Sequence, residues 1–463
     1  MDPEARENVD PAAAPPADLT RDAPPEGTPQ PAREGRLHDK TLTRRRALKY
    51  GLVGLAGAAG AGAVLHWLIR GNGEGLGASE VAHIFRGDAP DGKLWELWKK
   101  RGWAVEARHY VKIGQSVKCR LCPNECLLRP GDRGRCRTRA NKDGTLYSLA
   151  YGNPSTFGVD PIEKKPLYHF IPGTRIFSIA TPGCGFRCLN CQNWDLSQRK
   201  PEELKDPRGE EVRLTPERSQ QGLTNEQKWR SSMFPQDVVA VASYARCPSI
   251  AYTYSEPTAF YEYMYDTAKA AREKGIKNVW VTCGYIREKP LVELCRYLDA
   301  ANVDLKSFDD EIYRKLNSGK LQPILDTLKT LHRQGVWFEV TNLVVPTYTD
   351  DLDMIRRMCG WLLENVGPDY PLHFSRFHPQ HKLRHLPGTP VGVLQEARSI
   401  ALAAGLRYVY IGNVRDEADS NTTFCPGCKK PVIERDVYSV LAVNMADGKC
   451  RSCGTAIAGV WSV

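Results

Sequence analysis

Between about residues 175 and 412, short runs of β-branched and aromatic residues alternate with longer stretches in which apolar residues recur every three or four positions. The short runs predict buried strands, and the longer stretches predict amphipathic helices. The predicted strands cover residues 175–180, 249–254, 278–283, 302–306, 337–345, 372–377 and 407–412. Because strands that alternate with helices form parallel sheets with right-handed crossovers, we expect an α/β fold, a complete or partial TIM-type βα barrel.

Two of the predicted helices cover residues 258–275 and 321–335. The second stretch ends in Gly335, a residue suited to a helix C-cap. Active sites of βα barrels lie at the carboxyl ends of the strands. Residues that directly follow the predicted strands are therefore the first candidates for chemistry.

The pattern changes on both sides of the barrel region, which we assign to residues 175–420. A small cysteine-bearing segment, 104–174, precedes it, and a separate small module, 421–463, follows it. Within the barrel region, residues 199–232 are highly charged and weakly periodic, which predicts a surface insertion. Residues 71–103 are expected to form a linker.

The first seventy residues differ from the rest of the chain. Residues 1–40 are dominated by Pro, Ala, Asp, Glu and Arg and predict a disordered tail. In residues 41–70, Arg44 and Arg45 precede an uncharged stretch, 50–69, that is long enough to cross a bilayer. This arrangement resembles a twin-arginine export signal and predicts a membrane-associated protein of the cell envelope. The alternative is an anchor that leaves the barrel on the cytoplasmic face.

The composition argues against a nucleic-acid partner. The chain has 463 residues and a net charge of +10, but its Lys and Arg residues are interleaved with Asp and Glu rather than gathered into a basic run. Its fifteen cysteines are odd in number and cluster in CxxC pairs. This usage favours metal ligation over the disulfide framework of a small secreted protein.

Three cysteines directly follow the first predicted barrel strand: Cys184, Cys188 and Cys191. A closed structural zinc site takes four protein ligands, whereas three thiolates on a four-iron cluster leave one iron free for another ligand. The spacing and the position therefore predict a 4Fe-4S cluster at the active-site end. The alternatives are a zinc site completed by a distant residue and three packed cysteines.

Two further sets hold four cysteines each. Cys119, Cys122, Cys126 and Cys136 form a closed set, for which a structural zinc and a second iron–sulfur cluster that relays electrons both stay open. A redox-active disulfide there would leave two thiols unexplained.

The second set forms two CxxC pairs near the C-terminus, which resemble a zinc ribbon: Cys425, Cys428, Cys450 and Cys453. Zinc is favoured, although the same ligands permit a rubredoxin-like iron. Cys247, Cys295 and Cys359 lie in or beside helical patterns and are interpreted as buried small apolar residues.

The CxxxCxxC motif after the first strand of a βα barrel resembles that of the radical S-adenosylmethionine (SAM) enzymes. The stretches "CQNWDLSQ", "AYTYSEPT", "VDLK", "VTNLVVP", "RFHP" and "YVYIGN" together look like the branch related to pyruvate formate-lyase activating enzyme. Within that branch, the chain is most similar to the radical SAM enzyme of the AmmeMemoRadiSam system. The resemblance runs from about residue 104 to the C-terminus.

The resemblance implies an oxidoreductase-type radical SAM enzyme. A 4Fe-4S cluster would reductively cleave SAM to a 5'-deoxyadenosyl radical that abstracts hydrogen from an unknown substrate, and a partner protein is one candidate because activases act on proteins. An electron donor and a Memo-like companion protein are implied as partners. The implied SAM contacts are Glu256, Asp304, Lys306, Asn342 and His378.

Two positions depart from the family pattern. Asn190 stands where relatives often have an aromatic or apolar residue, and Cys283 stands where an Asn is common. A competing hypothesis is a non-catalytic iron–sulfur electron-transfer or metal-binding protein on the same barrel. It predicts bound iron without affinity for SAM.

Overall fold

Residues 84–219, 221–414 and 419–462 are described by a computed structural model. The expected disordered tail, the twin-arginine-like segment and residues 71–83 of the expected linker lie outside these residues. Among the helices of the described residues, none combines the length and the apolar character that a membrane crossing requires.

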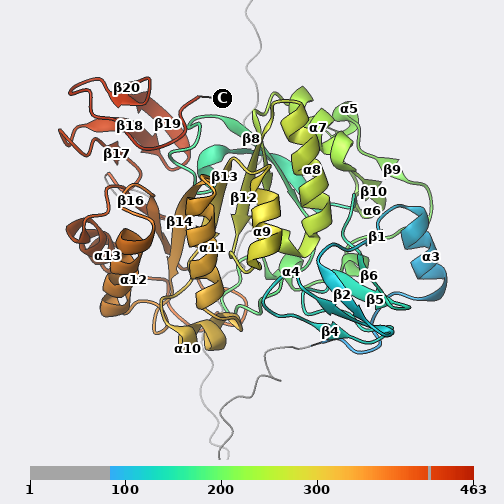
Figure 1. Ribbon diagram of the computed structural model, residues 1–463. Helices are drawn as coiled ribbons and strands as arrows, with labels where there is room; N and C mark the ends of the chain where they lie inside the picture. Colours follow the sequence, from blue (N-terminus) through green and yellow to red (C-terminus); the bar gives the residue numbers. More distant parts are fainter. Residues whose placement is uncertain (1–83, 220, 415–418, 463) are drawn as a thin grey trace, which may run out of the picture. The chain divides into compact units, whose positions relative to one another are not determined.

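One eight-stranded sheet carries the fold, in the order β16-β15-β14-β13-β12-β11-β8-β7 (Figure 1). Seven neighbouring strands are parallel: β8 (Arg175–Ala180), β11 (Ser249–Tyr252), β12 (Lys277–Thr282), β13 (Ala300–Asp304), β14 (Trp337–Val344), β15 (Leu372–Arg376) and β16 (Val409–Gly412). They agree with the seven predicted strands to within two residues at each end. The outermost strand, β7 (Thr156–Pro161), pairs antiparallel with β8 and was not predicted. The predicted α/β fold is confirmed, and the sheet is a partial barrel.

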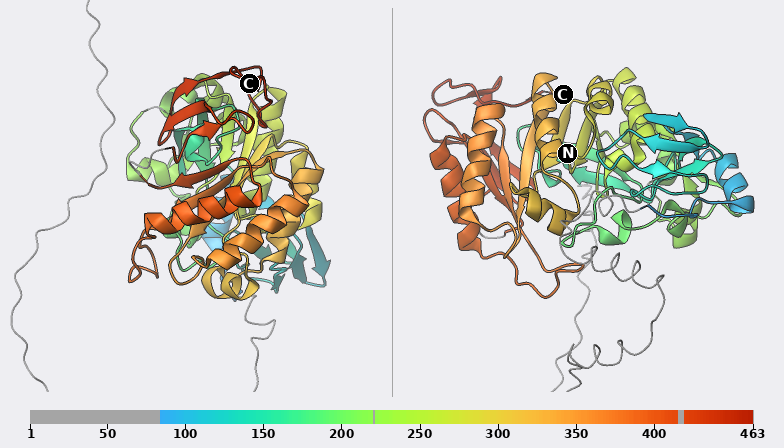
Figure 2. Two further views of the ribbon diagram at one scale, coloured as in Figure 1. Left: turned by 90° about the vertical axis from the view of Figure 1, so that its left-hand side faces the viewer. Right: turned by 60° about the horizontal axis from the view of Figure 1, so that its bottom comes forward.

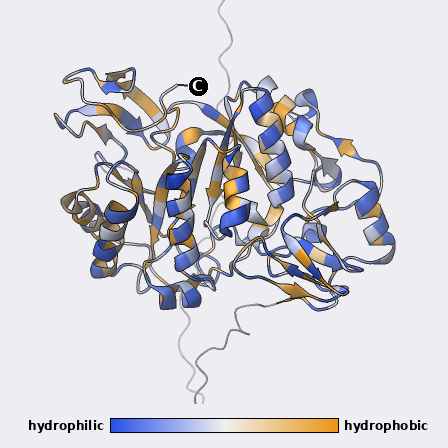
Figure 3. Cartoon of the chain, in the orientation of Figure 1, coloured by the Kyte–Doolittle hydropathy of each residue, from blue (hydrophilic) through white to orange (hydrophobic). Residues whose placement is uncertain are grey.

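Helices follow most of the parallel strands: α7 (Pro235–Tyr244), α8 (Tyr261–Glu273), α9 (Glu288–Cys295), α11 (Gln322–Arg333), α12 (Leu352–Asn365) and α13 (Val391–Ala404). The predicted helices 258–275 and 321–335 correspond to α8 and α11. Gly335 has a φ of 69° and its N–H donates to the carbonyl of His332, as expected of a residue that ends a helix. In Figure 3 the strands are largely apolar, whereas the helices carry both polar and apolar positions.

Successive residues of each strand point to opposite faces of the sheet. On β13, Ala301 and Val303 pack into the main apolar cluster together with residues of the helices, whereas Ala300 belongs to a second cluster with Ile176 and Val279. Residues 162–171, which include the 3-10 turn η1 (Ile162–Lys164), complete this second cluster. We call this side of the sheet, which is turned away from the helices, the inner face.

The cysteine-bearing segment before the barrel folds into two small antiparallel sheets. One contains β1 (Val105–Glu106), β6 (Thr145–Ser148) and β5 (Arg139–Lys142), and the other contains β2 (Tyr110–Ile113), β3 (Ser116–Cys119) and β4 (Leu127–Leu128).

The expectation of a linker over 71–103 is wrong for part of its described residues. Residues Gly92–Lys100 form the helix α3, in which Trp95 and Trp98 are buried. The two rings lie three positions apart and so share one helix face. The indole N–H of Trp98 donates to the carbonyl of Leu149 at 3.0 Å, so α3 packs against the cysteine-bearing segment.

The charged stretch 199–232 is only partly a surface insertion. It contains η2 (Pro201–Glu203), β9 (Val212–Arg213), α5 (Pro216–Ser219), α6 (Asn225–Arg230) and β10 (Ser231–Ser232). Leu214 and Lys205 are buried. The Lys205 ammonium donates to the carbonyls of Pro154 and Lys228 at 3.1 and 2.8 Å, which explains how a charged segment can pack against the barrel.

The C-terminal module contains β17 (Thr423–Phe424), β18 (Pro431–Asp436), β19 (Ser439–Val443), β20 (Met445–Ala446) and β21 (Lys449–Cys450). It is the red part of Figures 1 and 2. The module docks near the amino-terminal end of β16, where Cys425 and Val432 pack with Tyr408 and Tyr410. The module therefore lies near the amino-terminal ends of the strands, opposite to their carboxyl ends.

A buried polar network ties this module to the barrel. The fully buried carboxylate of Glu339, near the start of β14, accepts backbone N–H groups of Tyr168 and His169 at 3.0 and 2.7 Å and lies 2.7 Å from Nε2 of His373. From the module, the buried guanidinium of Arg435 donates to the carbonyl of Tyr168 at 2.6 Å. The segment that contains Tyr168 and His169 is thus hydrogen-bonded both to β14 of the barrel and to the C-terminal module.

His169 is held in its neutral form. Its Nδ1 lies 2.7 Å from the carbonyl of Ala458 and its Nε2 lies 2.6 Å from the hydroxyl of Tyr410, so Nδ1 donates and Nε2 accepts. Burial lowers the pKa of His169 to about 4. The module therefore docks through an uncharged imidazole.

Candidate functional site

The loop Cys184–Cys191 joins β8 to the short helix α4 (Trp194–Ser197) at the carboxyl edge of the sheet (Figure 1). Cys184 and Cys188 are buried, and Cys191 is half-buried. Each sulfur lies near one hydrogen-bonding group: the N–H of Phe186 at 3.3 Å from Cys184, Nδ2 of Asn317 at 3.2 Å from Cys188 and the hydroxyl of Ser197 at 3.2 Å from Cys191. Hydrogen bonds of this kind stabilise thiolates and tune the metal centres that they hold.

A π-helical turn, η4 (Tyr313–Asn317), fixes the conformation of this loop. The backbone N–H of Arg187 donates to the carbonyl of Asn317 at 3.0 Å, and that of Leu189 donates to the carbonyl of Leu316 at 2.8 Å. Sequence reasoning missed Asn317, since nothing in "KLNSGK" connects it with a cysteine 129 positions earlier. The side chain of Asn317 is buried, and its role can be recognised only when the position of this polar turn in the structure is known.

Asp304 and Lys306 lie together at the carboxyl end of β13, on the inner face, because they alternate with Ala301 and Val303. Their charged groups are 2.8 Å apart, and the N–H of Lys306 donates to the hydroxyl of Tyr313 at 2.9 Å.

Lys306 and Cys188 also affect each other electrostatically. Burial raises the pKa of the Cys188 thiol to about 12, and the positive charge of Lys306 acts in the opposite direction. Lys306 also contacts Tyr313 of η4, and η4 is hydrogen-bonded to the loop, so the end of β13 and the loop Cys184–Cys191 belong to one site.

Glu256 lies a few residues after β11 and is buried, but its carboxylate already accepts hydrogen bonds from within the chain. One oxygen accepts the N–H of Thr258 at 2.9 Å and the hydroxyl of Thr282 at 2.8 Å, and the other accepts the N–H of Cys283 at 2.9 Å. Glu256 thus joins the carboxyl ends of β11 and β12 and begins the 3-10 turn η3 (Pro257–Phe260). A carboxylate offers about four acceptor positions, so one stays available for a ligand.

Asn342 does not lie with these residues, and its expected contact with SAM is corrected. It alternates in step with Phe338 and Val340, which pack against the helices, so its side chain is on the helix-facing side of the sheet. Its Nδ2 donates to the carbonyl of Leu305 at 2.8 Å. Asn342 therefore supports the strand that carries Lys306.

His378 follows β15 at the same edge of the sheet and is exposed. The two positions that depart from the family pattern both lie close to the loop. Asn190 is buried within it, and its side-chain oxygen has no hydrogen-bond partner among the described residues. Cys283 lines the same cavity as Gly185 of the loop.

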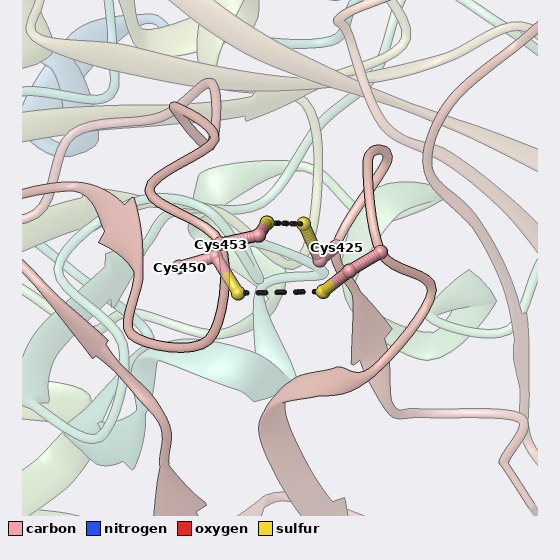
Figure 4. Close-up of side chains that lie close together, drawn as sticks. Cys425, Cys450 and Cys453 are labelled. Carbon is pink, nitrogen blue, oxygen red and sulfur yellow. Dashed lines mark hydrogen bonds between the residues drawn. The ribbon is translucent and has the colours of Figure 1, made fainter.

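The four cysteines near the C-terminus form a compact group: Cys425, Cys428, Cys450 and Cys453. Figure 4 labels Cys425, Cys450 and Cys453 of this group. Their sulfur atoms all lie within 4.8 Å of one another, with 3.5 Å between Cys425 and Cys453 and 3.7 Å between Cys428 and Cys450. Four thiolates at about 2.3 Å from a tetrahedral ion stand about 3.8 Å apart. The group fits one metal ion, and its position at the opposite edge of the sheet separates it from the loop Cys184–Cys191.

The remaining cysteines fall into two groups. Cys247, Cys295 and Cys359 are buried, as predicted, and burial raises the pKa of each thiol. The N-terminal set lines a cavity of about 30 Å³ next to Glu256 and Cys283: Cys119, Cys122, Cys126 and Cys136.

Several known proteins are similar to this chain. The model of the radical SAM superfamily matches residues 178–359, from β8 into α12. An uncharacterised protein from Methanocaldococcus jannaschii is 42% identical over 355 residues, which cover 76% of this chain and 98% of that protein.

More distant relatives have a named activity. The pyruvate formate-lyase-activating enzyme of Clostridium pasteurianum is 24% identical over 200 residues, which cover 42% of this chain and 71% of the enzyme. The pyruvate formate-lyase 1-activating enzyme of Escherichia coli K12 is 25% identical over 214 residues, which cover 45% of this chain and 75% of the enzyme. Together with the partial barrel and its cysteine loop, these matches show that the chain belongs to the radical SAM superfamily and is related to the pyruvate formate-lyase-activating enzymes.

Proposed function

We propose that the protein reductively cleaves SAM and uses the resulting radical to abstract hydrogen from a protein substrate. The observation that carries this proposal is the set of three thiols on one loop at the carboxyl edge of the sheet, each with its own hydrogen-bonding group. Cys184, Cys188 and Cys191 are the residues that would hold a 4Fe-4S cluster with one iron open. A reduced cluster of this kind with bound SAM supplies methionine and a 5'-deoxyadenosyl radical.

The neighbouring residues suit the polar groups of SAM. Lys306 carries a positive charge at the inner face and suits the carboxylate of the methionine moiety, while Asp304 keeps the Lys306 ammonium in place. Glu256 has one acceptor position left for the amino group, and the exposed imidazole of His378 lies at the rim. These residues bind and orient the cofactor, and the chemistry of bond cleavage belongs to the cluster and SAM.

The proposed substrate class rests on the kinship with activating enzymes. Pyruvate formate-lyase-activating enzymes act, as their name says, on another protein, and we extend this class of substrate to the present chain. We further propose that the protein works within the AmmeMemoRadiSam system, with a Memo-like companion protein and a separate low-potential electron donor.

The direct test uses the full chain, reconstituted with iron and sulfide under anaerobic conditions. With SAM and a strong reductant, we expect formation of 5'-deoxyadenosine and methionine in equal amounts, and addition of SAM alone should change the spectrum of the cluster. Bound iron that is indifferent to SAM would instead support the non-catalytic electron-transfer hypothesis.

Replacing Lys306 by methionine is expected to weaken SAM binding by about tenfold to a hundredfold, because a hydrogen bond to a charged group contributes about 1.5–3 kcal/mol. The measurement is the apparent Kd from the spectral titration. Lys274→Met is the matched control, since Lys274 is exposed at the end of α8. Equal affinities of the two variants would remove Lys306 from the SAM site.

We also propose that residues 50–69 attach the protein to the membrane and that the barrel lies in the cell envelope. The support is the pair Arg44 and Arg45 before an uncharged stretch of bilayer length. After cell fractionation, we expect the full chain with the membranes and a variant lacking 41–70 in a soluble fraction. Recovery of the full chain in the cytosolic fraction would contradict the proposal.

A further inference from the structure

The four N-terminal cysteines come together from separate turns of the small sheets. Cys119 ends β3, Cys122 and Cys126 flank the turn before β4, and Cys136 precedes β5. All four cysteines line one cavity.

This set is wider than a single-ion site. Among the described residues, only the C-terminal group brings three or more such ligand atoms within 4.8 Å of one another. The N-terminal thiols instead line part of a cavity of about 30 Å³. About 10–15 Å³ holds one water molecule, so this cavity has more space than one zinc ion between four thiolates requires.

Charged groups of both signs lie at the cavity, since the carboxylate of Glu256 and the guanidinium of Arg139 both line it. Arg139 is buried, and its Nη1 lies 3.7 Å from Cys119 Sγ, while its Nη2 pairs with the buried carboxylate of Glu262. Arg135 is also buried, and its Nε donates to the carbonyl of Gly185 at 2.9 Å. Buried guanidinium groups beside a thiolate set offset the net negative charge of a thiolate-bound metal centre.

The cavity adjoins the loop Cys184–Cys191. Gly185, from that loop, and Cys283 both line it. Gly183 has a φ of 103°, and a Cβ there would overlap the carbonyl of Cys136, so the backbones of the two cysteine segments touch. Only glycine permits this approach at residue 183.

We propose that Cys119, Cys122, Cys126 and Cys136 hold a second 4Fe-4S cluster directly beside the loop Cys184–Cys191. Because four thiolates would ligate all four irons, no iron could bind a substrate. The second cluster would therefore serve in electron transfer. One electron would enter from a low-potential donor protein and leave toward the first cluster. The presence of the second cluster is independent of the proposed function, whereas its role in supplying electrons rests on it.

Iron, acid-labile sulfide and zinc are to be counted in the anaerobically reconstituted full chain, because a single-ion site contributes no sulfide. We expect about eight iron atoms and eight sulfides per chain from two clusters. A variant with Cys184, Cys188 and Cys191 all replaced by alanine should keep about four sulfides, even if SAM cleavage proves not to be the activity. Cys122→Ala with Cys126→Ala should also keep about four, bound at the first site.

The matched control replaces the buried, unclustered Cys247 and Cys295 by alanine and should keep about eight sulfides. In the reduced wild-type protein, magnetic coupling between neighbouring clusters should broaden the electron paramagnetic resonance signal, and each cluster-deficient variant should lose this broadening. About four sulfides in the wild type and none in the variant lacking Cys184, Cys188 and Cys191 would overturn the proposal. Zinc that is lost with Cys122 and Cys126 would then identify a closed zinc site.

Discussion

Replacing Cys188 by alanine is expected to abolish the reductive cleavage of SAM. Cys188 is the central thiol of the loop, and two remaining thiolates cannot hold a four-iron cluster with the geometry that leaves a single iron open. The substitution also removes the acceptor of the Asn317 side chain, which donates to Cys188 Sγ at 3.2 Å. We expect 5'-deoxyadenosine to fall to the level of a reaction without protein and the iron content to fall by about four atoms per chain.

Cys359→Ala is the matched control for this prediction. Cys359 is fully buried in α12 and belongs to the apolar core, so its replacement costs about 1 kcal/mol of stability and leaves SAM cleavage unchanged. Cleavage that survives Cys188→Ala at the rate of this control would exclude the loop Cys184–Cys191 as the cluster site. The comparison separates loss of a ligand from loss of a buried thiol.

Replacing Glu339 by alanine is expected to destabilise the protein by about 3–5 kcal/mol. The substitution leaves two backbone N–H groups, of Tyr168 and His169, and the imidazole of His373 without their common acceptor. Since Glu339 is fully buried, water does not replace the lost carboxylate without opening the packing between residues 162–171 and the inner face. The measurement is the denaturant midpoint of the metal-loaded protein together with protease sensitivity of the C-terminal module.

Glu288→Ala provides the contrast. Glu288 also forms an ion pair, with Arg333 at 2.6 Å, but its side chain is 68% exposed. Exposed pairs contribute little, so we expect a change of at most about 0.5 kcal/mol. Glu339→Gln keeps one acceptor oxygen and should fall between the two. If Glu339→Ala were as stable as Glu288→Ala, the docking of the C-terminal module would not depend on this network.

Several features were predictable because they depend on residues close together in the sequence. The strand β8 is an apolar run bounded by polar residues, and the predicted range 175–180 is the observed one. The helix α11 shows the three-to-four-residue apolar period and ends before Gly335. The spacing CxxxCxxC directly after β8 places three thiols on one short loop in any fold that forms this strand. Local periodicity and spacing carry this information because the chain geometry of helices and strands repeats over a few residues.

Other features involve residues far apart in the sequence. Asn342 is next to a predicted strand end, yet its face was decided by the register of β14 against β13, which directs it to the helices. Asn317 reaches Cys188 only because η4 folds back onto the loop. The two tryptophans of α3 are buried only because the cysteine-bearing segment covers them.

The sequence by itself therefore determined the order of the seven parallel strands and of helices such as α8 and α11, the three cysteine sets, and the end of the strands at which the chemistry belongs. The tertiary structure alone decided that the N-terminal set is wide and adjoins the loop Cys184–Cys191, whereas the C-terminal set is compact and lies at the opposite edge. Both sets have four thiols, and the spacing of the cysteines along the sequence does not determine the volume between them. That volume depends on how separate turns pack against one another, and such packing is governed by contacts between distant parts of the chain.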